Sequence, residues 1–370
     1  MRFLVYSHVI HTKFDGKFFG YGPYVKEMNI WGKHVSELWI LAPLSKEEKP
    51  DPIDLAYQHQ KVRFIKVPSF QIKSLKDAPN AVWACLVILS KGFFYSLRAD
   101  HLHLRCPGNM GLLACLIQIL LPWKSKTAKY AGNWDPKANK PWSYKLQQGI
   151  LNSRFLTHKM KVLAYGEWEG QSSNILPFFT ATYSERDIVP IKKEPLSKGI
   201  NLVFVGSMTE NKSPQTAYQV YKSLRRKGFV VSLDFLGKGP ELDVIRALAK
   251  KDDLSDGIKL WGNVEASKVK EVLQKAHFLV FVSKSEGWPK AVAEAMFWGC
   301  VPITTPVSCV PQMLNFGERG FLIDENSDPA KIISDLIKSE SNFTEISEKA
   351  SSWSRKYTLE YFEEEIQKLL

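Results

Sequence analysis

The chain has 370 residues, more than one ordinary hydrophobic core holds, so two domains are expected. Its 45% hydrophobic and 24% charged residues are typical of a globular enzyme, and its 5 scattered cysteines, without a Cys-x-x-Cys pair, argue against a disulfide framework and a zinc site. The net charge of +12 lies in residues 1–183, which hold 24 basic and 12 acidic residues, and it favours an anionic partner, nucleic acid or an acidic membrane surface, over a merely solvated surface.

The first half of the sequence alternates short apolar runs with helical stretches. Strands are predicted at 2–9, 38–43, 62–67, 101–106, 127–132 and 160–165, and helices near 23–33, 79–96, 108–121 and 142–158. Because the N-terminal run is short and has no small-residue cleavage site after it, it predicts a buried strand and not a signal peptide.

Two runs in this half, residues 81–89 and 111–123, are strongly apolar. Each is under about 15 residues, short of the roughly 20 that span a bilayer, so core helices are expected. Shallow contact with a membrane is the alternative, because basic residues flank both runs. The flanking basic residues are Lys91, Arg98, Lys124, Lys126 and Lys129.

The second half repeats the alternation more clearly. Strands are predicted at 200–206, 230–237, 258–262, 277–282, 301–305 and 321–324, and helices near 214–228, 240–251, 266–275, 289–298, 328–338 and 343–368. Strands that alternate with helices of this length form parallel sheets wrapped by helices. The sequence therefore predicts an α/β protein with two doubly wound domains, residues 1–183 and 184–353, joined in the polar stretch 184–199.

Two loops of the second half could bind a diphosphate, because ligands of an open parallel sheet bind at the carboxyl ends of its strands. Gly206 and Lys212 lie between a strand and a helix, where a glycine lets the backbone approach a ligand and a lysine neutralises a phosphate. Gly237 and Gly239, on either side of Lys238, suit a tight turn or a diphosphate against the backbone. A surface lysine and an ordinary turn remain the alternatives.

Two further loops carry a turn and a pair of carboxylates. Gly262, Asn263 and Val264 bend the chain and could offer backbone groups to a nucleotide base. Glu286 lies at a strand end, and Glu294 lies on an apolar helix where it is expected to be partly buried. Carboxylates at these places can accept hydrogen bonds from the hydroxyls of a sugar and a ribose.

Together, the four loops in this order resemble those of the retaining glycosyltransferases of the GT-B fold, specifically family 4, the glycosyl transferases group 1. The resemblance is specific in the second domain and looser in the first. It implies two Rossmann-like domains that face a cleft, an acceptor-binding domain followed by a donor-binding domain, with residues 354–370 crossing back to the first. It also implies that Glu286 contacts the donor sugar, Glu294 the ribose and Lys212 the diphosphate, with residues 262–264 beside the base.

The chain departs from the family at several positions. Ser207 follows Gly206 where the family has an arginine, so Lys238 or Lys290 could supply the missing cation. The strand at 99–107 resembles one whose final histidine lies near the reacting sugar; Arg105 takes that position, and His103 shares its face. Either residue could be the catalytic one, unless His103 is a core histidine.

The first domain offers donor and acceptor contacts. Gly22 matches the glycine loop of the family that approaches the phosphates, and Tyr24 follows it as an acceptor-binding candidate. Trp134 could stack on a sugar, with Asn133 and Asp135 orienting an acceptor hydroxyl. A turn built for shape alone is the alternative for these three residues.

From these observations we expect a retaining glycosyltransferase that moves a sugar from a UDP- or GDP-sugar to a glycan or lipid-linked acceptor in surface polysaccharide synthesis. No Asp-x-Asp occurs in the chain, so neither a divalent metal nor another cofactor is expected. The basic first domain points to a cytoplasmic protein that is peripheral on an anionic membrane, and not to a nucleic-acid partner. The alternatives are a sugar-nucleotide epimerase of the same fold and a nucleotide-sugar-binding protein without turnover.

Overall fold

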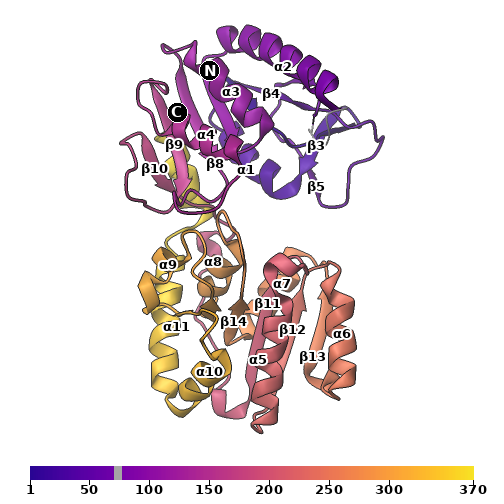
Figure 1. The fold of residues 1–370 in the computed structure, drawn as a ribbon, viewed down its shortest axis with the longest axis vertical. Coiled ribbons are helices and arrows are strands. Elements are labelled where there is room, and N and C mark those ends of the chain that lie inside the picture. Colours follow the sequence, from indigo (N-terminus) through magenta and orange to yellow (C-terminus); the bar gives the residue numbers. More distant parts are fainter. Residues whose placement is uncertain (71–76) are drawn as a thin grey trace. The chain divides into compact units, whose positions relative to one another are not determined.

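The computed structural model describes residues 1–70 and 77–370, which form two compact units (Figure 1). Unit 1 consists of Met1–Phe179 together with Glu363–Leu370, and unit 2 of Thr180–Phe362. The stretch 184–199, predicted as the join, lies inside unit 2. The last helix, α12 (Leu359–Gln367), ends in unit 1, where Glu363 accepts hydrogen bonds from Lys33 at 2.7 Å and His34 at 2.9 Å.

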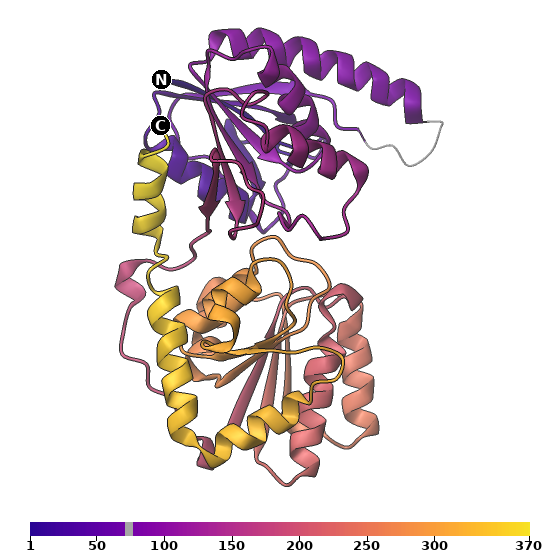
Figure 2. The ribbon, with the colours of Figure 1, turned by 60° about the vertical axis from the view of Figure 1, so that its left-hand side comes forward.

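Unit 1 is built on a seven-stranded parallel sheet in the order β10-β9-β8-β7-β1-β4-β6. Its strands are β1 (Arg2–Tyr6), β4 (Glu37–Pro43), β6 (Val62–Val67), β7 (His101–Cys106), β8 (Ser125–Tyr130), β9 (Met160–Tyr165) and β10 (Ile175–Phe178). Its other helices are α1 (Gly22–Gly32), α2 (Ala78–Arg98), α3 (Asn109–Ile119) and α4 (Trp142–Leu151). Figure 2 shows α2 as the long helix along the outside of this unit.

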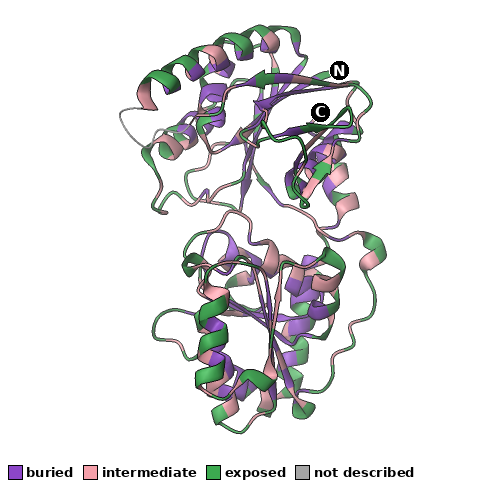
Figure 3. Cartoon of the chain, turned by 90° about the vertical axis from the view of Figure 1, so that its right-hand side faces the viewer, coloured by how far each residue is buried: buried purple, intermediate pink, exposed green. Residues whose placement is uncertain are grey.

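Helices cover both faces of this sheet because successive side chains of a strand point to opposite faces. On one face, Leu4 packs in the core cluster that includes Ile88 of α2 and Ile117 of α3. On the other, the ring of Phe3 stacks on that of Trp31 from α1, with centroids 5.4 Å apart. The central strands are therefore buried on both sides, while the helices keep an exposed side (Figure 3).

A small antiparallel sheet in unit 1 is absent from the sequence prediction. It consists of β2 (Thr12–Phe14), β3 (Lys17–Tyr21) and β5 (Asp54–Ala56), in that order. Strands of three to five residues with few buried side chains show no clear apolar run, so a pattern of buried residues does not find them.

Unit 2 holds a six-stranded parallel sheet in the order β13-β12-β11-β14-β15-β16. Its strands are β11 (Ile200–Val205), β12 (Val231–Leu236), β13 (Ile258–Gly262), β14 (Phe278–Phe281), β15 (Val301–Thr304) and β16 (Phe321–Leu322). Its helices are α5 (Pro214–Arg226), α6 (Glu241–Lys251), α7 (Ala266–Lys275), α8 (Lys290–Phe297), α9 (Val310–Met313), α10 (Pro329–Lys338) and α11 (Glu340–Ser354). The predicted α/β class with two parallel sheets is confirmed.

Candidate functional site

The four loops singled out in unit 2 follow strands that are neighbours in the sheet. They come after β13, β12, β11 and β14, which lie side by side in this order. The strands are parallel, so their carboxyl ends meet at one edge, where an open α/β sheet binds ligands. The loops thus form one continuous edge, which we call the donor edge.

Glycines let the loops of the donor edge pack backbone against backbone. A Cβ on Gly237 would lie 1.8 Å from the carbonyl oxygen of Gly206, and one on Gly239 would lie 2.2 Å from that of Met208. The amide of Gly237 also donates to the carbonyl of Gly262 at 2.8 Å. Close packing between neighbouring loops therefore accounts for Gly237 and Gly239.

Lys212 and Glu286 form an ion pair across two loops of the donor edge. Lys212 closes a short helical turn after β11, Glu286 follows β14, and their side chains are only 20% and 11% exposed. The amide of Lys284 donates to the carbonyl of Asn211 at 2.9 Å, which holds the two loops together. The residues predicted to bind the diphosphate and the sugar are thus adjacent in space, although 74 positions separate them in the sequence.

Ser308 supports the turn that carries Glu286. Its Oγ donates to the carbonyl of Gly287 at 2.7 Å, and its backbone has a φ of +51°. That φ lies in the left-handed region that favours glycine. The sequence alone does not mark Ser308 as part of the site, because its contact partner lies on a different loop.

Glu294 is half-buried on α8, as the sequence predicts. Its Oε1 accepts a hydrogen bond from Thr182 Oγ1 at 2.8 Å. Lys290, Tyr183 and Glu294 line a small pocket of about 10 Å³, and Glu286 is not among its lining residues. Burial raises the pKa of Tyr183, and the charge of Glu294 raises it further.

The remaining candidates for donor binding are more exposed to solvent. Lys238 and Asn263 are exposed in the loops after β12 and β13, and Val264 is half-buried. A Cβ on Gly262 would meet nothing within 4 Å, so the turn at this position has open space beside it.

In unit 1, Arg105 is paired with Glu27. The Arg105 Nη1 to Glu27 Oε1 distance is 2.5 Å, and the two side chains are 11% and 10% exposed. Burial acts to lower the pKa of Arg105, but the charge and hydrogen bond of Glu27 together with Tyr24 and Tyr165 outweigh it, so the pKa is raised. Arg105 is therefore a fixed cation, 5.2 Å from the ring centroid of Tyr24.

His103 is a core histidine, which corrects the expectation that it approaches the site. It is fully buried, and its Nδ1 lies 2.8 Å from Thr127 Oγ1. Its ring packs against Trp31 of α1, with centroids 4.7 Å apart. Burial and then the charge of Arg105 lower its pKa well below the usual value, so the ring is neutral and closed off from a substrate.

Gly22 and Tyr24 also differ from expectation. A Cβ on Gly22 would lie 2.4 Å from the carbonyl oxygen of Ile53, and the Gly22 amide donates to that oxygen at 3.2 Å. Tyr24 is 6% exposed. The glycine therefore makes room for a neighbouring loop rather than for a phosphate, and the tyrosine lies in the core rather than against an acceptor.

The side chains of the turn at residues 133–135 stabilise the local structure. Trp134 is 2% exposed and meets the ring of Tyr130 edge-on, with centroids 4.8 Å apart, so it does not stack on a sugar. Asn133 Oδ1 accepts from the amide of Asp135 at 2.9 Å, and Asp135 Oδ1 from that of Lys137 at 2.8 Å. Both side chains hold the local backbone, as asparagine and aspartate do in turns.

A pocket of about 380 Å³ in unit 1 was not predicted. It lies at the carboxyl ends of β1, β4, β6 and β7, which are neighbours in the sheet, and His8, Ser69, Asn109 and Tyr144 give it polar groups. Burial and the charge of Arg105 lower the pKa of His8, which keeps this ring neutral at neutral pH. A histidine directly after the first strand was the available signal. We call this space the unit 1 pocket.

Metal ligation finds no support within residues 1–70 and 77–370. No group there brings together three or more His, Cys, Asp or Glu side chains able to hold a metal ion.

The second unit matches a known family. Residues 186–356 match the family model described as Glycosyl transferases group 1. A Salmonella typhimurium protein, the putative colanic acid biosynthesis glycosyltransferase WcaL, is 29% identical over 133 residues, which are 34% of this chain and 33% of that one. The N-acetyl-alpha-D-glucosaminyl L-malate synthase of Bacillus anthracis is 26% identical over 147 residues, 38% of this chain and 37% of that one. The matched stretch thus spans about a third of each relative's length.

Solved structures match across both units. Anabaena HepE, in complex with UDP and glucose, superposes with a TM-score of 0.66 at 12% identity and covers 100% of this chain and 98% of that one. WaaG, a glycosyltransferase involved in lipopolysaccharide biosynthesis, gives a TM-score of 0.59 at 14% identity, covering 98% of each chain. The chain has the GT-B fold of glycosyltransferases, as the sequence predicts.

Proposed function

We propose that this chain, whose residues 186–356 match the family model of the glycosyl transferases group 1, transfers a sugar from a nucleotide-sugar to a hydroxyl of a glycan or a lipid-linked acceptor. The observation that carries the proposal is the Lys212–Glu286 pair beside the glycine loops of the donor edge. The UDP and glucose bound to HepE support a nucleotide-sugar donor, and the colanic acid pathway in the name of WcaL supports a polysaccharide product.

In this proposal the donor edge binds the nucleotide-sugar. Lys212 neutralises the diphosphate, and Glu286, displaced from its lysine, accepts hydrogen bonds from the sugar hydroxyls. Glu294 binds the ribose once Thr182 yields its hydrogen bond. Residues 262–264, with open space at Gly262, lie beside the base.

Transfer proceeds with retention. The bond between the anomeric carbon and the diphosphate oxygen breaks, the acceptor oxygen bonds to that carbon on the same face, and the acceptor proton passes to the departing diphosphate oxygen. The protein positions the two substrates and stabilises the negative charge that develops on the diphosphate. Lys212 is the side chain in place for the second task.

The unit 1 pocket is the acceptor site in this proposal. Its polar groups can bind hydroxyls, and a neutral His8 can donate or accept one hydrogen bond at a sugar hydroxyl. The lining is also partly apolar, including Phe70 and Met110, which suits the faces of a sugar ring.

A donor panel tests the proposal. The protein is mixed with UDP-, GDP- and ADP-sugars, with and without lipid-linked or glycan acceptors, and nucleotide release is measured. Release that requires an acceptor supports transfer; an epimerised sugar, or binding without release from any donor, contradicts it.

The Lys212→Gln variant tests the site. Because a charge-assisted hydrogen bond contributes about 1.5–3 kcal/mol, its loss is expected to weaken UDP binding about tenfold to a hundredfold. Lys284→Gln is the matched control, since Lys284 lies in an adjoining loop, is 62% exposed and pairs with Glu210. Equal losses of UDP affinity in the two variants would show that Lys212 does not bind the diphosphate specifically.

A further inference from the structure

One side of α2 presents large apolar side chains to solvent. At about 100° per residue, they fall within an arc of about 120° on the helix. The opposite side, including Ala84, Ile88 and Gly92, is buried in the core of unit 1. The exposed residues are Val82 (60%), Trp83 (60%), Leu86 (60%), Phe93 (38%), Phe94 (47%) and Leu97 (43%).

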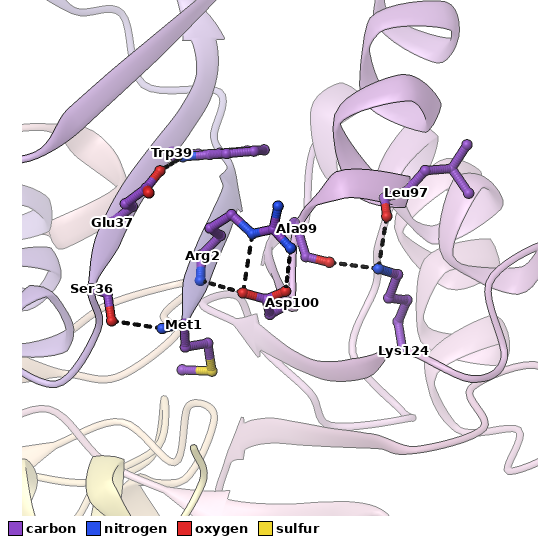
Figure 4. A network of polar contacts seen from close by, with 9 residues as sticks. All are labelled: Met1, Arg2, Ser36, Glu37, Trp39, Leu97, Ala99, Asp100 and Lys124. Atoms are coloured by element: carbon purple, nitrogen blue, oxygen red, sulfur yellow. Dashed lines mark hydrogen bonds and ion pairs between the residues drawn. The ribbon is translucent and has the colours of Figure 1, made fainter.

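The exposed apolar surface continues beyond α2. Leu116 (42% exposed), Leu120 (63%) and Trp123 (58%) lie on α3, which packs against α2, and in the segment after it. Lys124 ties that segment to the end of α2, because its Nζ donates to the carbonyls of Leu97 at 2.9 Å and Ala99 at 2.6 Å (Figure 4). We call these nine residues the α2 face. Exposed apolar patches of this kind mark interaction sites.

The charge around the α2 face is basic. Between residues 78 and 134 the only acidic residue is Asp100, and it is bound by Arg2 at 2.7 Å (Figure 4). Lys91 and Arg98 are exposed at one margin of the apolar arc. Unit 1 as a whole holds 25 Lys and Arg against 15 Asp and Glu. An anionic partner is therefore favoured.

Three of the lysines expected to flank a membrane contact are not part of this margin. Lys126 is 2% exposed, and burial lowers its pKa to about 8. Lys129 is fully buried, with its Nζ donating to the carbonyl of Phe179 at 2.9 Å. Lys124 caps the end of α2, as described above. Lys91 and Arg98 each donate to one backbone carbonyl, of Lys66 at 2.9 Å and of Phe94 at 3.2 Å, but both are exposed and can also meet a partner at this surface.

The buried contacts of α2 within unit 1 favour a helix that lies on a membrane over one that crosses it. By length and composition alone α2 could span a bilayer, and it is the helix that passes this test within the described residues. However, the hydroxyl of Tyr6 bonds to the carbonyl of Gly92 at 2.8 Å and to Ser96 Oγ at 2.6 Å. Leaving the unit would break these buried contacts. A helix with an apolar arc and a basic margin instead lies in the plane of the interface.

We propose that the α2 face docks flat on an anionic lipid membrane. The apolar side chains enter the region between headgroups and acyl chains, Trp83 and Trp123 take the interfacial position that tryptophan prefers, and Lys91 and Arg98 meet lipid phosphates. The proposal extends the proposed function, because a lipid-linked acceptor lies in such a membrane. Its test needs neither donor nor acceptor, so its failure and a failure of sugar transfer are distinguishable.

The test is co-sedimentation of the full chain with vesicles of phosphatidylglycerol and phosphatidylcholine, or of phosphatidylcholine alone. Wild type is expected to bind the anionic vesicles at low salt, with a blue shift of tryptophan emission. Replacing both Lys91 and Arg98 with glutamine should weaken binding about 25-fold, since each basic residue contributes about fivefold near an anionic surface. The double variant Trp83→Ser and Leu86→Ser should lower the affinity for anionic vesicles by on the order of tenfold.

Two control variants carry the same chemical changes elsewhere. Trp142→Ser removes a 74% exposed tryptophan of α4, and glutamine at both Lys227 and Lys259 removes two exposed charges of unit 2. Both should bind vesicles as wild type does, and circular dichroism checks that every variant is folded. No binding to anionic vesicles, equal binding to neutral ones, or dimerisation abolished by the Trp83 and Leu86 changes without vesicle binding would overturn the proposal.

Discussion

Lys212 and Glu286 neutralise each other in the absence of a ligand. A diphosphate that approaches the ammonium group has to replace the carboxylate as its partner, and the released carboxylate then becomes available to sugar hydroxyls. Under the proposed function, the pair therefore couples recognition of the diphosphate to recognition of the sugar. The sequence could predict each residue, because each follows a strand, but their pairing depends on β11 and β14 being neighbours, which no local pattern shows.

The two glutamates should differ in their effect on nucleotide binding. Glu294→Ala is expected to weaken UDP or GDP binding about tenfold to a hundredfold, because a charge-assisted hydrogen bond to the ribose is lost. Glu286→Ala should leave the affinity for free nucleotide nearly intact and lower turnover, because its contact is with the sugar. Calorimetry measures the affinities. Equal losses would contradict the assignment, and circular dichroism must show that Glu294→Ala, which also loses its contact with Thr182, remains folded.

Several site residues predicted in unit 1 lie in the core, for one physical reason. Alternation along a strand shows which residues share a face, but not whether a helix covers that face. His103 and Arg105 do share a face, and α1 covers it with Trp31, so His103 is buried while Arg105, nearer the carboxyl end, reaches Glu27. An aromatic residue in a turn, such as Trp134, likewise gives no sign of whether it faces solvent or core.

Buried histidines should make unit 1 sensitive to acid. Burial lowers the pKa of His11 and of His101 to about 4, and that of His103 is also lowered. The unfolded chain binds protons as the pH falls below about 6.5 while the folded chain does not, so stability is complete above pH 6.5 and is lost as the pH falls toward 4. The loss approaches about 3 kcal/mol for His11 or His101. Urea unfolding at pH 7, 6 and 5 measures it.

The His101→Gln variant provides the control for this pH effect. It removes one titrating ring, so its stability should fall less steeply between pH 7 and pH 5 than that of wild type. An unfolding midpoint that stays constant over this range in wild type would show that the buried histidines take up protons in the folded chain as they do in the unfolded one, and would contradict the lowered pKa values.

At the level of the elements, the bounds of several strands could be predicted from the sequence. The strands β6, β7, β9 and β13 match their predicted bounds, because short runs rich in apolar residues between turn residues mark strands even where, as in β6 and β13, the strand lies at the edge of the sheet. The unit 1 pocket could not be predicted, since its lining combines the ends of four strands whose order is not sequential with Tyr144 of α4. The role of Gly237 and Gly239 likewise depends on the order of the strands in the sheet, because the backbone that these glycines contact lies in the loop after an adjacent strand.

Glycine substitutions test the packing of the donor edge. Gly237→Ala should destabilise the protein by roughly 3 kcal/mol or more and weaken nucleotide binding, because its Cβ would meet the carbonyl of Gly206 at 1.8 Å. Gly262→Ala is the comparison: it also has a positive φ, +66°, but open space, so only about 1 kcal/mol of backbone strain is expected. Thermal unfolding measures both. Equal destabilisation would mean that backbone strain alone, and not loop packing, sets the cost.

Across the whole molecule, charge and function divide between the two units. Unit 2 holds 25 basic and 23 acidic residues and contains the donor edge, whereas unit 1 carries the excess of basic residues and the α2 face. The sequence predicted this division, because the charge asymmetry and the loop motifs lie in different halves. It did not predict which lysines are exposed, because Lys126 and Lys129 follow a strand pattern whose side chains are covered on both faces.

This division predicts that a nucleotide alone acts on one unit. UDP should slow amide hydrogen exchange in the loops at 206–212, 237–240, 262–264 and 284–290. Amides exchange when a segment opens locally, and a bound ligand makes the opening of the loops that contact it less favourable. At a concentration of 100 times its dissociation constant, the ligand stabilises the state that binds it by about 2.7 kcal/mol. Exchange around the unit 1 pocket should be unchanged by UDP and slowed only by an acceptor, and mass spectrometry of peptides resolves the two regions. Protection of the loops at 8–10 and 107–110 by UDP alone would place the nucleotide in unit 1 and would contradict the assignment of the donor edge.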